Sequence, residues 1–183
     1  GRRPGRVSVN LSLRQLKQRN FITRVHDTVR RHGVPPEALE LEITETTLME
    51  DARRTVRILD ELHAMGMKLA IDDFGTGYSS LSALQQFPIG TLKIDQSFVR
   101  HATTSHDQAT IVAMVIEMGH SLGKDVVAEG VESEDQLRFL RALSCDYAQG
   151  LLFGAPMSAA AYADLLADHQ AGAGRYRPLF ARG

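Results

Sequence analysis

Residues 68–80 read KLAIDDFGTGYSS, an apolar run that ends in two adjacent acids and a glycine-rich loop. A short aliphatic run bounded by turn-forming residues predicts a buried β-strand. Glycine tolerates backbone conformations closed to other residues, so Gly75 and Gly77 allow the chain to turn sharply after the strand. The stretch therefore predicts a strand that delivers two carboxylates, Asp72 and Asp73, to the mouth of a loop.

Five similar runs occur elsewhere in the chain, and segments with helical spacing separate them. Repeated strand–helix–strand units require crossover connections, so we expect a mainly parallel sheet with the helices packed outside it. A closed (β/α)₈ barrel takes eight units and about 250 residues, so six units leave either an open sheet or a barrel whose N-terminal part is absent. The predicted strands are 6–11, 39–44, 68–74, 91–95, 125–129 and 148–153, and the predicted helices are 13–32, 47–65, 104–122, 134–143 and 159–169.

Composition limits the classes of function. With 183 residues, 43% of them hydrophobic, the chain suits one domain, which we place at 1–170. Residues 171–183 lose the periodic pattern and are expected to form a loosely held tail. The 21 basic and 22 acidic residues exclude a sequence-independent clamp on nucleic acid, which needs a basic surplus.

Features of the sequence also bear on the compartment. The single cysteine, Cys145, is expected to be a core residue, which favours a reducing cytoplasm. No apolar run is long enough for a membrane span, so any anchor of the parent protein would lie in another domain.

Polar residues lie at or near the carboxyl end of every apolar run. Because these ends meet at one mouth of a parallel barrel, the side chains are expected to face one cavity. Carboxylates gathered in one cavity repel one another unless cations bind them. One acid alone at a strand end is more often a helix cap or a surface group, so the prediction depends on all six runs sharing the pattern. The residues are Asn10, Glu42, Asp72, Asp73, Lys93, Glu129 and Gln149.

The type of ligand atom indicates the metal. Oxygen ligands, and seven histidines without a metal-binding spacing, predict hard ions such as Mg²⁺ or Mn²⁺ rather than zinc. Two such ions sharing a carboxylate form the usual clamp for in-line displacement at phosphorus. Asp72 and Asp73 suit such sharing only if the strand ends between them, because neighbours on a regular strand point to opposite faces.

The loop at 75–80 also allows a rival interpretation. Gly75 and Gly77 follow a strand, as in a dinucleotide-binding fingerprint, and Asp95 lies about where a ribose-binding acid would be. Against this, Ser80 stands at the third glycine position, and two acids directly before the loop would repel a pyrophosphate.

Six motifs together resemble the EAL family in order and spacing, over nearly the whole chain up to about residue 166. The resemblance implies a modified TIM-type barrel, here about six of its eight βα units, that hydrolyses cyclic di-GMP to pGpG with two Mg²⁺ or Mn²⁺ ions. The motifs are VNLS (9–12), EITE (42–45), DDFGTGYSS (72–80), LKID (92–95), AEGVE (128–132) and QG (149–150).

The resemblance assigns roles by position. It implies that Lys93 orients the attacking water, that Glu129 is the candidate general base, and that Asp73 binds the second metal. It implies that Glu45 holds the loop and couples metal binding to loop position and dimerisation. The implied metal ligands are Asn10, Glu42, Asp72, Asp73 and Glu129, and the implied substrate and loop residues are Gly75, Thr76, Gly77, Ser79, Ser80, Glu132, Gln149 and Pro156.

The chain also departs from the family pattern. The strand with the family's Glu-Ala-Leu signature, which contributes a metal-binding glutamate, has no counterpart here. Leu151 and Ala155 stand where the family usually has an aromatic and a basic residue. A catalytically inactive module that binds cyclic di-GMP or a protein partner is therefore the alternative to an enzyme. Further expectations are regulatory domains upstream in the parent, and a homodimer or larger oligomer formed through exposed strand edges.

Overall fold

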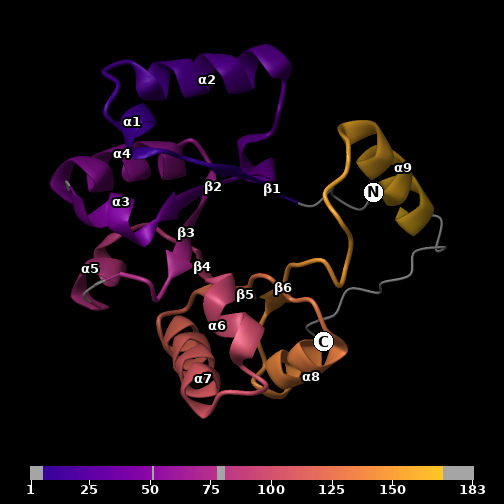
Figure 1. The fold of residues 1–183 in the computed structure, drawn as a ribbon. Helices are drawn as coiled ribbons and strands as arrows, with labels where there is room; N and C mark the ends of the chain where they lie inside the picture. Colours follow the sequence, from indigo (N-terminus) through magenta and orange to yellow (C-terminus); the bar gives the residue numbers. More distant parts are fainter. Residues whose placement is uncertain (1–5, 51, 78–80, 171–183) are drawn as a thin grey trace.

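The strands form one parallel sheet in a computed structural model, which describes residues 6–50, 52–77 and 81–170. The strand order follows the chain from β1 to β6 without reversal, and the sheet curls into a half-barrel with helices outside it (Figure 1). The predicted α/β barrel architecture is therefore confirmed. The strands are β1 (Val7–Asn10), β2 (Leu39–Thr44), β3 (Lys68–Phe74), β4 (Thr91–Ile94), β5 (Asp125–Ala128) and β6 (Tyr147–Ala148).

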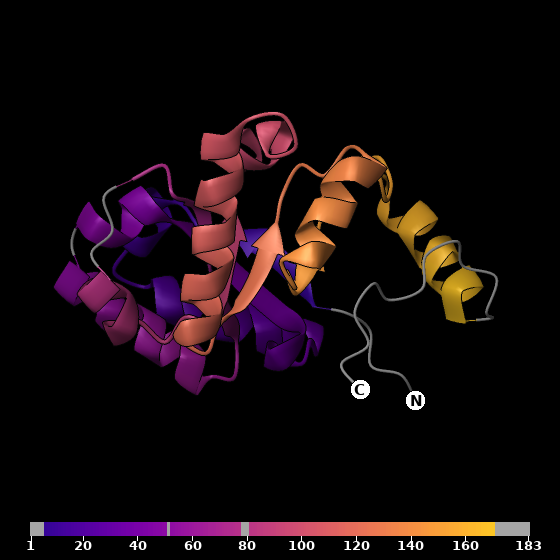
Figure 2. The same cartoon turned by 90° about the horizontal axis from the view of Figure 1, so that it is seen from below.

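The helices cover the convex face of the sheet and connect successive strands; α9 lies apart, beyond α8 (Figures 1 and 2). Among the described residues no helix is both long and apolar enough to cross a bilayer. The helices are α1 (Leu13–Leu16), α2 (Phe21–His32), α3 (Glu45–Glu50), α4 (Ala52–Ala64), α5 (Leu81–Gln86), α6 (Gln96–His101), α7 (His106–Ser121), α8 (Glu134–Ala142) and α9 (Ala159–Gln170), with a 3₁₀ turn η1 (Pro36–Ala38).

Local signals explain helix boundaries that hydrophobic periodicity missed. The predicted helix 13–32 is two helices: Ser12 forms a capping box with Gln15 at the start of α1, which ends after one turn at Lys17, and α2 begins after Asn20. α2 ends at Gly33, whose φ of 62° is the left-handed conformation typical of a helix terminus. Residues 47–65 likewise contain two helices. The segment 104–122 begins only after Ser105, whose side chain caps α7.

The two faces of the sheet differ in polarity. Outward-facing residues of the central strands are aliphatic and pack beneath the helices: a side-chain carbon at Gly119 of α7 would lie only 2.4 Å from Val126 and 3.5 Å from Leu92. Residues one position along face the inside of the half-barrel, where Glu40, Glu42 and Lys93 are buried. The alternation along each strand therefore places every second side chain in the interior.

The last strand is shorter than the predicted 148–153. Pairing with β5 ends after Gln149, because Gly150 lies directly against the backbone of Val131, in the segment that follows β5. A side-chain carbon at Gly150 would lie 2.2 Å from the carbonyl oxygen of Val131. Leu152 then donates its backbone N–H to that same oxygen. This crossing turns residues 151–153 away from the sheet, so the aliphatic run there is not a strand. Cys145 is fully buried, as predicted.

Candidate metal centre and the cavity beside it

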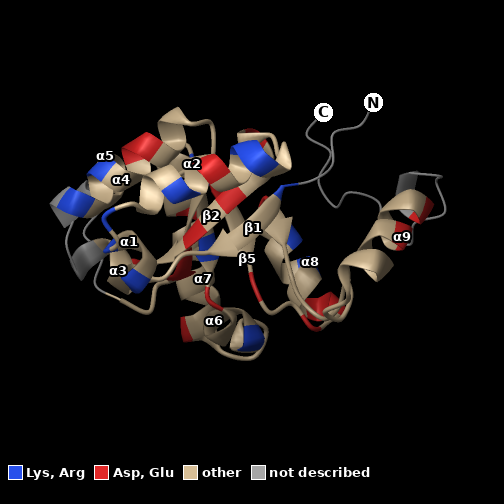
Figure 3. Ribbon diagram, turned by 90° about the horizontal axis from the view of Figure 1, so that it is seen from above, with Lys and Arg blue, Asp and Glu red and all other residues tan. Residues whose placement is uncertain are grey.

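Lys93 lies at the centre of the polar residues at the strand ends. Its Nζ is 2.7 Å from Glu42 Oε1, 2.6 Å from Glu129 Oε1 and 3.1 Å from Asp72 Oδ1. These side chains come from β2 to β4 and the residue after β5. Each occupies a position whose side chain faces the inside of the half-barrel. Figure 3 shows basic and acidic positions close together around β2 and β5. Four strands therefore deliver one ammonium and three carboxylates to a single point.

The strand that carries Asp72 and Asp73 is distorted between these two residues. Without such a distortion, neighbouring side chains would point to opposite faces of the sheet. The register of β3 against β4 shifts between Ile71 and Phe74, and Asp73 has a φ of 53°, in the left-handed region that non-glycine residues seldom adopt. As a result, carboxylate oxygens of Asp72, Asp73 and Glu129 all lie within 4.8 Å of one another. Backbone strain at a cluster of this kind is typical of a functional site.

The cluster carries more negative than positive charge. Four carboxylates, those of Glu42, Asp72, Asp73 and Glu129, against one ammonium leave three negative charges in a half-buried space. Burial raises the pKa of Glu129, although Lys93 opposes the shift, and the pKa of Asp73 is raised by burial and by Asp72. For Lys93, burial alone would lower the pKa, but hydrogen bonds to Glu129 and Glu42 outweigh it and raise the pKa above its usual value.

These residues fit a divalent cation. Asp72 Oδ1 is buried, and among the described side chains it has no hydrogen-bond partner despite its distance of 3.1 Å from Lys93 Nζ. A buried oxygen without a hydrogen bond, next to two more carboxylates, is the arrangement that a cation stabilises. All donors are oxygen atoms, which hard divalent ions prefer. The chain thus carries a carboxylate cluster suited to binding metal.

Asn10 lies beside this cluster and does not contact it through any recorded hydrogen bond. It pairs in register with Glu42 at the end of β1 and is exposed. The letters Glu-Ala-Leu do occur in the chain, at 37–39, but they belong to η1 and the first residue of β2. Glu37 therefore lies at the opposite end of β2 from the cluster and is not a ligand of it.

Glu45 fixes the position of the loop after β3 through hydrogen bonds to its backbone. Its Oε2 accepts hydrogen bonds from the backbone N–H groups of Gly75 and Gly77, each 3.1 Å long, and the side chain is buried. A side-chain carbon at Gly77 would lie 2.9 Å from the carboxyl group of Glu45, and Gly75 has a φ of 99°. Thr76 closes the turn by donating from Oγ1 to the carbonyl oxygen of Asp73 at 2.8 Å.

This loop geometry excludes the dinucleotide interpretation. In such a fingerprint the glycine N–H groups approach a pyrophosphate, whereas here those of Gly75 and Gly77 bind a carboxylate of the same chain. Within the described residues, the strand order also runs from β1 to β6 without the reversal that creates a dinucleotide crevice. Asp95 caps α6 and shares a hydrogen bond with Asp73. Ser79 and Ser80 lie outside the described residues.

A cavity of about 540 Å³ adjoins the cluster at Glu129 and runs toward α9. It brings together the predicted substrate residues Glu132, Gln149 and Pro156. Its wall also contains residues that the sequence did not single out: Gln96 packs against Gly130, where a side-chain carbon would lie 2.5 Å from the Gln96 Cβ. The other additional lining residues are Gly154, Met157 and Tyr162. Only Gln96, directly after the Leu-Lys-Ile-Asp motif, had a local signal that could have identified it.

Comparison with known proteins agrees with this geometry. The family model described as EAL domain matches residues 2–156. The bifunctional diguanylate cyclase/cyclic di-GMP phosphodiesterase MucR of Pseudomonas aeruginosa is 44% identical over 153 residues, which are 84% of this chain and 22% of MucR. The chain spans about a fifth of the length of the curated relatives it matches.

Two solved structures extend the comparison. The PaMucR phosphodiesterase in complex with c-di-GMP matches with a TM-score of 0.83 and 43% identity, covering 86% of this chain and 64% of that one. A manganese and c-di-GMP complex of BlrP1 from Klebsiella pneumoniae matches with a TM-score of 0.76 and 34% identity, covering 82% and 39%. With six ordered motifs, the same fold and a family match over most of its length, the chain belongs to the EAL domain family.

Proposed function

We propose that this chain is the phosphodiesterase part of a signalling protein that hydrolyses cyclic di-GMP to pGpG. The observation that supports this most strongly is the position of Lys93 Nζ, within 3.1 Å of three carboxylates, which come from β2, from β3 and from the residue after β5. A module that only binds a partner has no need of so much uncompensated charge in one place. MucR and NbdA, both of Pseudomonas aeruginosa, are phosphodiesterases of this kind by name.

Each residue has a role in the proposal. Asn10, Glu42, Asp72, Asp73 and Glu129 hold two divalent cations, Mg²⁺ or Mn²⁺. When bound, these ions supply an activated water and neutralise charge at phosphorus. Glu129, with its raised pKa, accepts a proton from the attacking water. Lys93 orients that water and offsets the charge that develops on the phosphate.

The cavity beside the cluster holds the rest of the substrate. Glu132 and Gln149 offer hydrogen-bonding groups along its wall, and Pro156 with Met157 offers apolar surface to a nucleobase. Glu45 keeps the loop after β3 against the site and couples it to a homodimer. Regulatory domains upstream in the parent complete the proposal.

The test is incubation of the protein with cyclic di-GMP and Mn²⁺, with chromatographic detection of pGpG. We expect Glu129→Gln to lower turnover at least about 100-fold, the usual contribution of general base catalysis. Asp135→Asn is the matched control, because Asp135 is exposed on α8 and pairs only with Arg138 among the interactions recorded for it. The control should retain activity.

An inactive sensor is the second candidate, since Leu151 and Ala155 replace the aromatic and basic residues usual in the family. Binding of cyclic di-GMP, measured by calorimetry, separates the two. If the wild-type protein binds the dinucleotide and yields no pGpG with either metal, the enzyme proposal is wrong and the sensor proposal stands.

A further inference from the structure

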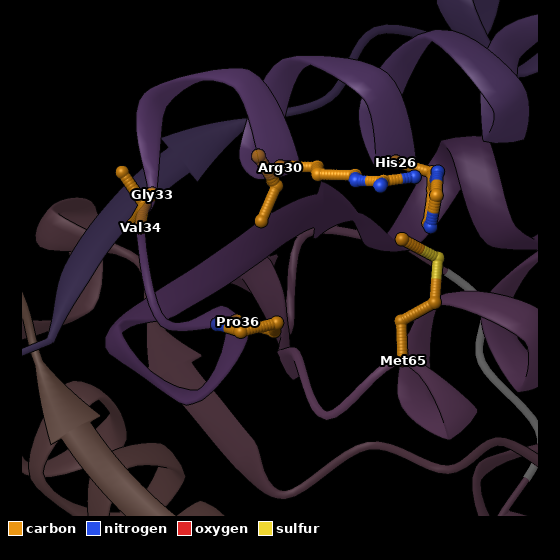
Figure 4. Close-up of a pocket in the computed structure, with 7 residues that line it drawn as sticks. His26, Arg30, Gly33, Val34, Pro36 and Met65 are labelled. Atoms are coloured by element: carbon orange, nitrogen blue, oxygen red, sulfur yellow. The ribbon is translucent and has the colours of Figure 1, made fainter.

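A second cavity lies away from the carboxylate cluster, between the last two turns of α2 and the turn that follows α4. Its volume is about 420 Å³, within the usual range for small-molecule sites. Figure 4 shows its walls, which come from three separate segments of the chain. The lining residues are His26, Val29, Arg30, Gly33, Val34, Pro36 and Met65.

The backbone explains why a hollow forms here. α2 stops at Gly33 in the left-handed conformation, and Val34 donates its N–H back to the carbonyl oxygen of Val29. The chain then turns into η1 through two prolines. A side-chain carbon at Gly33 would meet nothing within 4 Å. The helix end, η1 and the Met65 turn therefore border a hollow that is open to solvent.

The lining of the cavity has two chemical parts. Val29, Val34, Pro36 and Met65 give it apolar walls, and no acidic residue lines it. Its charged or chargeable groups are Arg30 and His26. Figure 4 shows the Arg30 side chain lying along α2 toward His26, whose ring points toward Met65. One end of an apolar cavity thus carries two nitrogen-rich groups side by side.

Neither Arg30 nor His26 has a strong hydrogen bond or ion pair with another described residue. No ion pair or hydrogen bond of the Arg30 guanidinium is recorded within the described part of the chain. His26 Nδ1 lies 3.4 Å from Asp27 Oδ1, and both side chains are more than half exposed, so that pair contributes little. An anion between Arg30 and His26 would meet two donors without displacing a strong partner.

The segment that contains α1 and α2, which forms one wall of the cavity, is rich in basic residues. Residues 12–32 hold six Lys and Arg residues against one Asp, a net charge of +5, while the whole chain has −1. Figure 3 shows the basic positions over α1 and α2. A local surplus of this size raises the concentration of anions near it. The basic residues are Arg14, Lys17, Arg19, Arg24, Arg30 and Arg31, and the acid is Asp27.

A simpler explanation covers part of this pattern. Basic residues in the last turn of a helix offset its dipole, and Arg30, Arg31 and His32 all qualify. That explanation treats Arg30 and Arg31 alike, whereas only Arg30 lines the cavity. It also says nothing about the four apolar residues opposite. The two arginines therefore provide a matched pair for a test.

We propose that this cavity binds a small anionic amphiphile, with its alkyl chain against Val29, Val34, Pro36 and Met65 and its carboxylate or phosphate between His26 and Arg30. Apolar walls select the chain, and the two basic groups select the charge of the head. The proposal is independent of the phosphodiesterase function, because no lining residue is shared with the carboxylate cluster or its cavity.

The test uses the full 183-residue chain with ¹³C-methyl-labelled methionine and follows the methyl resonances by NMR. Decanoate is the probe, and decanol, which has the same chain without the charge, is the comparison ligand. The protein has six methionines. Met65 reports on the cavity, while fully buried Met67 and exposed Met114 on α7 serve as internal controls.

We expect a saturable shift of the Met65 methyl with decanoate and a weaker response with decanol. Arg30→Gln should lower decanoate affinity by about fivefold, the scale of an exposed ion pair, and Arg31→Gln should leave it unchanged. Val29→Asp, which places a negative charge in the wall, should abolish the shift. Equal affinities for decanoate and decanol, equal effects of the two arginine variants, or an unmoved Met65 would each overturn the proposal. So would binding to anionic phospholipid vesicles with no Met65 shift, since it would assign the basic surface to a membrane instead.

Discussion

At the scale of single residues, the site depends on a balance between one lysine and several acids. Lys93 is almost fully enclosed, with 5% of its side chain exposed, and it contacts Glu42, Asp72 and Glu129. Removal of one partner from a buried ion cluster costs more than the pair contributes, because the remaining charges stay buried. Lys93 therefore holds the carboxylates together when metal is absent.

Lys93→Met tests this role. Without metal we expect the free energy of unfolding to fall by about 3 kcal/mol, since three carboxylates lose their common cation. Added Mn²⁺ should stabilise the variant more than the wild type, because the metal then supplies the missing positive charge. Urea denaturation with and without Mn²⁺ measures both effects. Lys68→Met, on the exposed start of β3, is the control, and an equal loss there would contradict the argument.

The raised pKa values of Glu129 and Asp73 predict how metal binding depends on pH. A carboxyl group whose pKa is raised in the folded state binds protons more readily there than in the unfolded chain, so protons compete with metal as the pH falls. We expect the thermal stabilisation by Mn²⁺ to shrink as the pH falls from neutral toward the raised pKa values of these two carboxyl groups. From these two groups alone the metal-free protein should gain stability over the same range, because the folded state binds more protons than the unfolded chain and protonation removes charges that burial and Asp72 disfavour. A stabilisation by Mn²⁺ that grows on acidification would count against the cluster as its site.

At the scale of elements, the loop after β3 links helix α3 to the cluster. Glu45, the first residue of α3, accepts hydrogen bonds from two N–H groups of this loop, and the loop begins at Asp72 and Asp73 of the carboxylate cluster. A shift of α3 would therefore move the loop, and the loop would move the carboxylates. This connection gives a physical route from a contact on α3 to the site.

Gly77→Ala breaks that connection selectively. The added carbon would lie 2.9 Å from the carboxyl group of Glu45. Either the hydrogen bonds of Glu45 must lengthen or the loop must move. We expect about a tenfold loss of phosphodiesterase activity, equivalent to about 1.4 kcal/mol, with a weaker effect on stability. Gly90→Ala is the matched control, because a side-chain carbon there meets nothing within 4 Å. Equal activities for both variants would show that loop position does not matter.

At the scale of the whole molecule, the sheet has two edges, β1 and β6, each paired on one side within the described residues. Val7 and Val9 of β1 are 54% and 44% exposed. Exposed aliphatic residues on an unpaired strand favour pairing with another chain. Self-association through these edges remains a prediction of the fold.

Val9→Lys should weaken this association, since a charge on an edge strand opposes pairing. Light scattering over a range of protein concentrations measures it, with a lower average mass expected for the variant. Met114→Lys is the control, as Met114 is 64% exposed on α7, which connects β4 and β5 and belongs to neither edge strand. A wild-type chain that stays monomeric throughout would contradict the prediction.

Much of this architecture was predictable from local sequence. Glu42, Lys93 and Glu129 each occupy an inward position of a strand whose apolar run is visible in the sequence, so their convergence follows from parallel strand geometry. The break between Lys17 and Asn20 was missed, because no glycine or proline marks it. The start of the helix predicted from residue 104 was placed too early, because the side chain of Ser105 caps α7. Residues 151–153 were wrongly predicted as a strand, because nothing local reveals that Gly150 must cross the backbone of Val131.

Residue types and their spacing are enough to establish the family, the alternation that lines the interior with polar groups, and which acids share one end of the sheet. How those acids are arranged relative to one another depends on the tertiary structure. The left-handed backbone at Asp73 brings two neighbouring carboxylates to one side, Lys93 takes the central place among them, and Glu45 takes up the glycine N–H groups that a nucleotide-binding loop would have offered to phosphate. Strand period and residue type are local properties, whereas distances between side chains of different strands depend on the curl and register of the whole sheet.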